Sequence, residues 1–193
     1  MSIAHAASIL LSATSIVFLA ELGDKTMIST AILAMRTKRF LSMLLISVSA
    51  FIVANTVAVL AAWVLEYAVN RIVVSVIAGL LFIVVGLWML KEREEEFKEF
   101  REGIVAYFLA ITFAEMGDKT QLAVFTTALA TGQPLHVLVG GIIGYTIANA
   151  IGVIIVKLLG ERVQWTKVKV FASAIMICIG LWLLVETLYE VLT

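Results

Sequence analysis

Charged residues are scarce in this sequence: they make up 15% of its 193 residues, whereas apolar residues make up 62%. A soluble domain has about 25% charged and about 45–50% apolar residues. The sequence also has only one cysteine and two histidines, which excludes a disulfide within the chain and disfavours a zinc or copper site. The formal net charge is zero, which argues against a nucleic-acid partner.

Long runs without a charged residue indicate helices that cross a lipid bilayer, because about 20 apolar residues span its core. Barrel strands are much shorter than these runs, so the sequence predicts an all-α integral membrane protein. The first twenty residues lack the basic start of a signal peptide, and we interpret them as part of a first spanning helix. Six transmembrane helices are predicted, over residues 7–35, 40–65, 72–90, 103–130, 137–159 and 168–189.

The sequence matches itself without a gap when it is shifted by 94 residues. The signature Glu21-Leu-Gly-Asp-Lys-Thr26 then falls on Glu115-Met-Gly-Asp-Lys-Thr120, and Asn55 falls on Asn149. A constant offset between several separate polar motifs is not expected from the chance similarity of apolar helices. We therefore predict two three-helix repeats, residues 1–90 and 103–193, joined by a charged cytoplasmic linker over residues 91–102.

An odd number of helices in each repeat predicts that the second repeat enters the membrane inverted relative to the first. Basic residues are more frequent in cytoplasmic loops. Eleven lie in or beside the segments 36–39, 91–102 and 160–167, and the opposite side carries only Arg71. These three segments are therefore predicted to face the cytoplasm, with the N- and C-termini outside it. Inverted repeats around a central site are common among secondary transporters.

The two signatures place six charged residues inside predicted membrane helices, each at a cost of about 2.5–3.5 kcal/mol. Such a cost favours a shared functional site, and the alternative is a purely structural cluster of ion pairs. On a continuous helix, residues three and four apart share a face, which groups the acids and the lysine of each signature. The predicted metal ligands are Glu21, Asp24, Glu115 and Asp118, and the predicted charge-balancing residues are Lys25 and Lys119.

Four carboxylates and two lysines leave a net charge of −2, which one divalent cation or two protons would neutralise. Burial and crowding favour the protonated form of a carboxylate, and metal binding must expel those protons. The charge count therefore predicts exchange of a divalent metal ion for protons, with no resident cofactor. The lysines either pair with the acids or carry protons themselves.

The side chains around the acids are mostly hard oxygen donors, which suit Ca²⁺, Mn²⁺ and Mg²⁺. Thr26 and Thr120 belong to this group, and Asn55 and Asn149 are either ligands or contacts between helices. Met27 and Gln121 occupy equivalent positions one turn beyond the acids. A Met27 ligand would favour Mn²⁺ over Ca²⁺, and the alternative is that Met27 only packs.

Twin Glu-x-Gly-Asp-Lys/Arg-Thr/Ser signatures in a six-helix chain resemble the GDT family of cation/proton exchangers. That family includes Golgi Ca²⁺/Mn²⁺ transporters and bacterial manganese exporters of the MneA type. The resemblance covers essentially the whole chain. It implies that Glu21, Asp24, Glu115 and Asp118 form the cation site with Thr26 and Thr120 nearby. It also implies a manganese exporter in a bacterial inner (plasma) membrane.

The sequence is also compatible with other functions. A Ca²⁺:H⁺ antiporter would use the same site, and an exporter of amino acids or other small solutes would share the six-helix plan but need fewer acids. A channel would lack obligatory proton counter-flow. An intramembrane aspartyl protease would use Asp24 and Asp118 as a dyad, but it has no need of the neighbouring Glu and Lys, so we do not predict an enzyme. The expected partners are a divalent metal ion and the lipid bilayer, and a homo-oligomer is an open alternative.

Overall fold

The computed structural model describes residues 2–91, 103–159 and 165–192. Over these residues the chain forms helices joined by short connections, with no β-strand. Two of the joints are breaks of three residues inside segments that we predicted to be single helices. The described helices are α1 (Ile3–Glu21), α2 (Lys25–Thr37), α3 (Phe40–Ala68), α4 (Arg71–Lys91), α5 (Ile104–Glu115), α6 (Lys119–Thr131), α7 (Pro134–Leu159) and α8 (Trp165–Leu192).

The prediction of continuous helices over residues 7–35 and 103–130 was wrong, because each of these segments is two helices. The other four predicted helices are confirmed with slightly longer bounds. Pro134 begins α7 rather than lying in the preceding turn, because the first turn of a helix needs no amide donor from that residue. The predicted linker 91–102 lies outside the described residues from position 92 onward.

Five of the described helices are long and apolar enough to cross a membrane: α1, α3, α4, α7 and α8. α5 is a shorter apolar helix. Many large apolar side chains on these helices are exposed, as a surface in contact with lipid requires, whereas the buried core is rich in alanine.

The two halves of the chain exchange their packing partners. α1 and α2, from the first half, lie against α7, whereas α5 and α6, from the second half, lie against α3. α4 and α8 run side by side, and the absence of side chains at Gly79 and Gly180 lets their backbones approach closely. Since each broken pair of helices rests on a long helix of the opposite half, the acidic residues of both breaks are held in the interior of one bundle, whereas Met116 and Gly117 of the second break are exposed.

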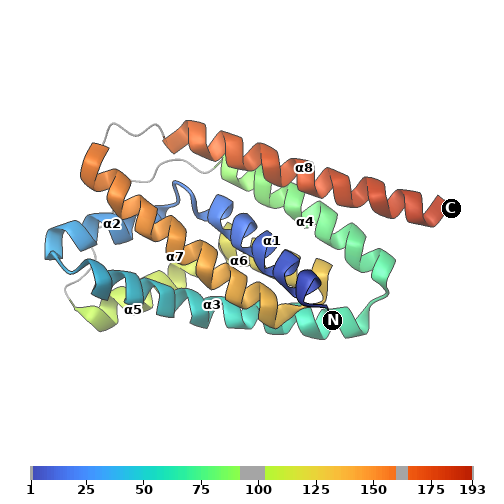
Figure 1. Ribbon diagram of the computed structural model, residues 1–193, viewed down its shortest axis with the longest axis horizontal. Coiled ribbons are helices and arrows are strands. Elements are labelled where there is room, and N and C mark those ends of the chain that lie inside the picture. The colour runs from blue at the N-terminus through green and yellow to red at the C-terminus, as the bar shows by residue number, and fades with distance from the viewer. Residues whose placement is uncertain (1, 92–102, 160–164, 193) are drawn as a thin grey trace.

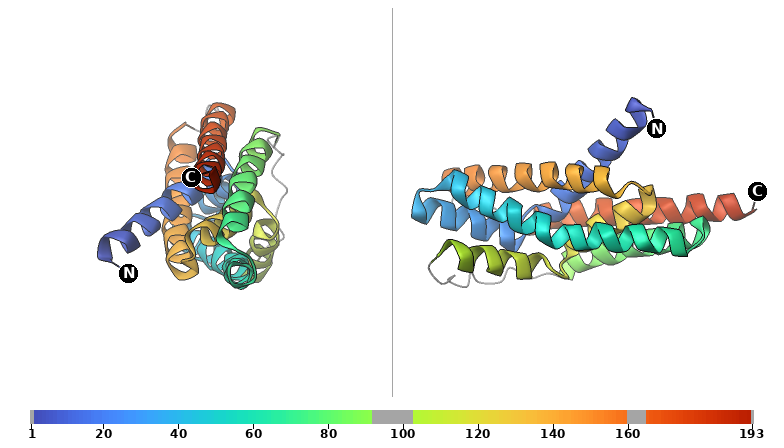
Figure 2. Two further views of the ribbon diagram at one scale, coloured as in Figure 1. Left: turned by 90° about the vertical axis from the view of Figure 1, so that its right-hand side faces the viewer. Right: turned by 90° about the horizontal axis from the view of Figure 1, so that it is seen from below.

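Figure 1 shows where the connections lie along the long axis of the bundle. The α2–α3 connection, the start of α5 and the end of α7 lie together at the left, and both termini and the α3–α4 connection lie at the right. Figure 2 shows the same separation from below, with the first turns of α1 projecting from the bundle. We call the left-hand end the α2–α3 end and the right-hand end the terminal end.

Candidate cation site

Both signatures form the same backbone structure, a helix that stops and restarts after three residues. Gly23 and Gly117 adopt left-handed conformations, with φ of 71° and 78°, which a residue with a side chain disfavours. The residue before each glycine is extended, and the aspartate after it is the N-cap of the next helix. Each aspartate therefore lies at a helix N-terminus, where the helix dipole stabilises negative charge.

These breaks change which side chains share a face. Glu21 and Glu115 end one helix, and Asp24 and Asp118 begin another, so the spacing of a continuous helix does not apply. All four carboxylates are nevertheless buried, with Asp118 the most exposed at 5%. The structure therefore buries every predicted metal ligand, through a local geometry that differs from the predicted one.

Threonine hydroxyls join the carboxylates within and between the two halves. The Thr26 hydroxyl lies 2.7 Å from Oε1 of Glu21 and 2.8 Å from Oδ2 of Asp24. Thr120 comes from the second half, and its hydroxyl donates to Oε2 of Glu21 over 3.2 Å. Glu21 is thus held by the threonines of both signatures, and the two breaks form one connected cluster.

The two signature lysines, which the sequence predicted to balance charge in the site, have different environments. Lys119 is 1% exposed and forms an ion pair with Asp24 of the other half, and it lies 3.8 Å from Oδ2 of Asp118. Lys25 is exposed. Because the break separates Glu21 from Lys25, the two side chains are not held on one helical face.

A second buried lysine lies beside the first break, and sequence reasoning assigned it to a basic cytoplasmic segment. Lys169 of α8 is 6% exposed, and its Cε would lie 3.5 Å from a Cβ added to Gly23. Trp165, one turn earlier, covers the same glycine. A basic residue near the start of a helix gives no signal in the sequence that distinguishes a buried lysine from a cytoplasmic one.

Some buried oxygen atoms have no hydrogen-bond donor among the described residues, including Oδ1 of Asn55, Oδ1 of Asn149 and Oε2 of Glu115. Each asparagine amide donates to the carbonyl four residues earlier and leaves its own oxygen unused. A buried acceptor without a partner costs about 1–3 kcal/mol. Uncompensated carboxylate and amide oxygens are the ligand type that hard divalent cations prefer, so the donor set fits such an ion.

Gln121 and Met27 support the structure around the breaks. The Gln121 amide accepts from the Gly117 amide and donates to the Ala54 carbonyl, both over 2.7 Å, so it fastens the second break to α3. Met27 is fully buried against α7, where a Cβ on Gly152 would lie 2.6 Å from its Cγ. The contacts of Met27 fit the packing alternative.

In this conformation the four carboxylates are not arranged to bind one metal ion together. Within the part of the chain that the structure describes, no three Asp, Glu, His or Cys side chains are grouped closely enough to hold a metal ion together. Asp24 instead contacts Lys119. An ion held by several of these carboxylates therefore requires a rearrangement that brings them together.

Comparison with known proteins agrees with the duplicated geometry. The family described as "Divalent cation/proton antiporter GDT1" matches twice, over residues 9–97 and 103–191. The chain belongs to this family. Together with the apolar helices, this makes it a multi-pass membrane protein of the antiporter class, as the resemblance of the signatures predicted.

Three relatives match the GDT1-family chain over most of their length. "GDT1-like protein 5" of Arabidopsis thaliana is 29% identical, over 85% of this chain and 90% of the relative. The "Putative manganese exporter" of Vibrio cholerae is 28% identical, over 92% and 90%. "Divalent cation/proton antiporter GDT1" of Saccharomyces cerevisiae is 26% identical, over 89% and 81%. No solved structure matches the chain.

Replacing either glycine of the breaks by alanine is expected to lower the stability of the protein by about 1–2 kcal/mol, the cost of a left-handed conformation. Gly23→Ala should cost more than Gly117→Ala. A Cβ at Gly23 would lie 3.3 Å from Trp165 Cε3, whereas one at Gly117 meets nothing within 4 Å. Thermal unfolding in detergent measures both losses, and a larger loss for Gly117→Ala would contradict this account of the breaks.

Proposed function

We propose that this antiporter exports Mn²⁺ from the cytoplasm across the inner (plasma) membrane in exchange for protons. It binds the ion between its two signatures, with Glu21, Asp24, Glu115 and Asp118 as ligands. Thr26, Thr120, Asn55 and Asn149 supply further oxygens or support the acids. The transported ion and the protons are substrates, the protein needs no resident cofactor, and it is not an enzyme.

The observation that carries this proposal is the set of buried polar groups that the two halves contribute, some of which meet across the repeat boundary. The Thr120 hydroxyl reaches Glu21 across the repeat boundary, and Lys119 reaches Asp24 across it. Asn55, Asn149 and Glu115 each have an oxygen without a donor among the described residues. After a rearrangement that brings these oxygens together, a divalent cation between them would satisfy them and take the place of the Lys119 ammonium beside Asp24.

The exchanged packing supports two inverted repeats of three membrane-spanning segments each. α1 and α2 on α7 correspond, under the shift of 94 residues, to α5 and α6 on α3. The family match also covers each half once. We place the α2–α3 end in the cytoplasm, because Arg36, Lys38 and Arg39 lie there, and both termini outside it.

The choice of Mn²⁺ rests on the Vibrio cholerae relative, whose name describes a manganese exporter. The ligand set alone suits Ca²⁺ equally well, because it consists of hard oxygens. A Ca²⁺:H⁺ antiporter on the same site is therefore the second candidate function. Met27 no longer favours Mn²⁺, since its contacts fit packing against Gly152.

Proton coupling follows from the buried charges. The four carboxylates are accompanied by two buried lysines, Lys119 and Lys169, so the region still holds a net charge of −2 when every group is ionised. Moving each uncompensated charge against 100 mV costs about 2.3 kcal/mol, and desolvation costs more. Two protons on the empty site remove this cost, and one divalent ion replaces them.

Inside-out vesicles with pH and voltage clamped separately test the function. We expect a lumen that is acidic relative to the medium to drive Mn²⁺ uptake, with about two protons leaving per ion. Collapsing the voltage alone should change the rate little, because the exchange is nearly electroneutral. Uptake that follows voltage and ignores the pH gradient would exclude this mechanism. Parallel assays with Ca²⁺ and Mg²⁺ identify the preferred ion.

A further inference from the structure

A chain of buried hydroxyl groups leads from Glu115 toward the α2–α3 end. The Tyr145 hydroxyl lies 3.3 Å from Oε1 of Glu115 and 2.7 Å from Oγ of Ser47. Thr30 lies 3.2 Å from Ser47, and the Tyr107 hydroxyl donates to Thr30 over 2.8 Å. We call Tyr145, Ser47, Thr30 and Tyr107 the hydroxyl chain. All four are at most 2% exposed.

The hydroxyl chain extends from Glu115 toward the α2–α3 end, in the same direction as α5. Tyr107 precedes Glu115 by eight residues on α5, which is about 12 Å of helix. α5 begins at the α2–α3 end (Figure 1), and Thr30 lies on α2 between the first break and the same end. The polar groups thus extend to one side of the carboxylates.

The repeat shows what occupies the equivalent positions on the other side. Shifting by 94 residues replaces Tyr145 by Phe51 and Thr30 by Val124, and replaces Ser47 and Tyr107 by Gly141 and Ala13. None of these residues has a hydroxyl group. Phe51, Val124 and Ala13 belong to one buried apolar cluster. The two halves therefore differ most clearly along this line.

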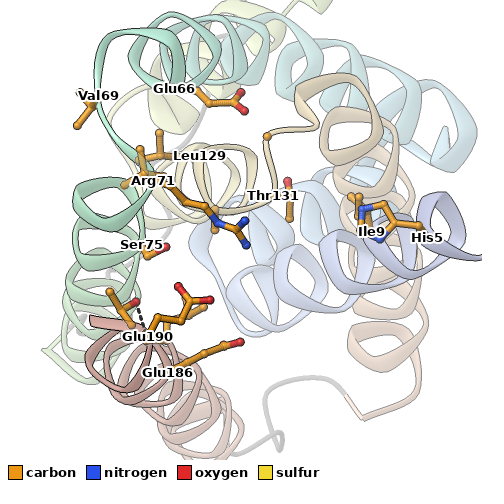
Figure 3. Close-up of a pocket in the computed structure, with 15 residues that line it drawn as sticks. His5, Ile9, Glu66, Val69, Arg71, Ser75, Leu129, Thr131, Glu186 and Glu190 are labelled. Atoms are coloured by element: carbon orange, nitrogen blue, oxygen red, sulfur yellow. Dashed lines mark hydrogen bonds between the residues drawn. The ribbon is translucent and has the colours of Figure 1, made fainter. Parts of the chain in front are cut away.

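A cavity of about 630 Å³ opens at the terminal end, and members of the apolar cluster form part of its lining. Figure 3 shows Glu66, Arg71, Glu186 and Glu190 around this cavity. Ile9, Val74 and Leu129, which are members of the cluster, line this cavity together with the charged residues. The cavity at the terminal end is thus partly apolar, whereas the hydroxyl chain extends from Glu115 toward the α2–α3 end.

We propose that the hydroxyl chain lines the route by which the divalent cation reaches the carboxylates from the α2–α3 end. This inference rests on the proposed function. A cation that loses its water shell needs replacement oxygens, which hydroxyl groups supply and apolar side chains do not. In this conformation the hydroxyls bond to one another and are buried, so the route is closed. When it opens, the same hydroxyls face the entering ion.

Cysteine accessibility tests the route with a matched pair of variants. Thr30→Cys and Val124→Cys occupy equivalent positions in the two halves, both side chains are buried at 3% exposure or less, and cysteine is close in size to each. The exposed Cys178 is first replaced by alanine. Thr37→Cys, at the exposed end of α2, identifies the membrane face of the α2–α3 end.

A membrane-impermeant thiol reagent is applied during transport to the face from which Thr37→Cys reacts. We expect Thr30→Cys to react about tenfold faster than Val124→Cys or more, because reaction follows exposure. Saturating Mn²⁺ should slow the reaction of Thr30→Cys. Equal rates for the two variants, or a faster reaction of Val124→Cys from this face, would overturn the assigned route.

A transport measurement shows whether the hydroxyl group of Thr30 serves the route or whether the side chain only packs. Thr30→Val installs the residue of the other half, and we expect it to raise the KM for Mn²⁺ at the α2–α3 face several-fold, with Thr30→Ser restoring it. An unchanged KM for Thr30→Val would contradict the role of the hydroxyl. The vesicle assay tests the proposed function separately from the route. If the proposed function fails, Mn²⁺ uptake by the wild-type protein ignores the pH gradient, whichever cysteine variant reacts faster.

Discussion

Replacing Glu21, Asp24, Glu115 or Asp118 by its amide is expected to lower Mn²⁺ transport by more than about a hundredfold, because an unbalanced buried charge costs about 3–5 kcal/mol. Each amide keeps the shape of the side chain and removes one charge that would balance the cation. The four carboxylates are at most 5% exposed, so water does not compensate for the loss. Metal uptake into proton-loaded vesicles measures the effect.

Glu190→Gln is the control for this series. Glu190 lies on α8 at the terminal cavity, is exposed and belongs to neither signature, so we expect its loss to leave transport near the wild-type rate. The amount of each variant in the membrane must be measured as well, because a variant that fails to insert also fails to transport. Two or more of the four signature variants transporting at the wild-type rate would refute a shared carboxylate site.

The sequence alone predicted the proposed site because charged residues are costly in a membrane and the repeat duplicates them. Glu21 and Asp24 stood out for this reason, and Asn55 stood out because Asn149 repeats it. The sequence left a break at each signature glycine open, because a glycine between helix-forming residues is compatible with both a continuous helix and a left-handed turn. The orientation of Lys25 depends on that choice, and the predicted face shared by Glu21 and Lys25 is absent for this reason.

The hydroxyl chain and Lys169 were missed for a different physical reason. Serine, threonine and tyrosine occur throughout membrane helices, where a hydroxyl often bonds to the carbonyl four residues earlier, as Ser173 does here. Only the exchanged packing of the halves brings Tyr145 of α7 between Ser47 and Glu115. A contact of this kind depends on tertiary structure, and no spacing along the chain indicates it.

The two signature lysines, which occupy the same position in the two signatures, are expected to respond differently to replacement. Lys119→Gln leaves Asp24 buried without its partner, so it should destabilise the protein by about 3–5 kcal/mol and reduce transport strongly. Lys25→Gln changes an exposed side chain, and surface replacements usually stay within about 0.5 kcal/mol. Thermal unfolding in detergent and vesicle transport, measured on both variants, give the comparison.

A double variant shows whether Lys119 serves transport through Asp24 or only holds the fold. In Lys119→Gln with Asp24→Asn, both charges of the buried pair are removed together, so most of the lost stability should return because no unpaired charge remains. Transport should stay absent, since Asp24 is also a ligand of the cation. Recovery of both stability and transport would mean that this pair is structural and that the ion binds without Asp24. Equal effects of Lys25→Gln and Lys119→Gln would contradict the asymmetry of the two breaks.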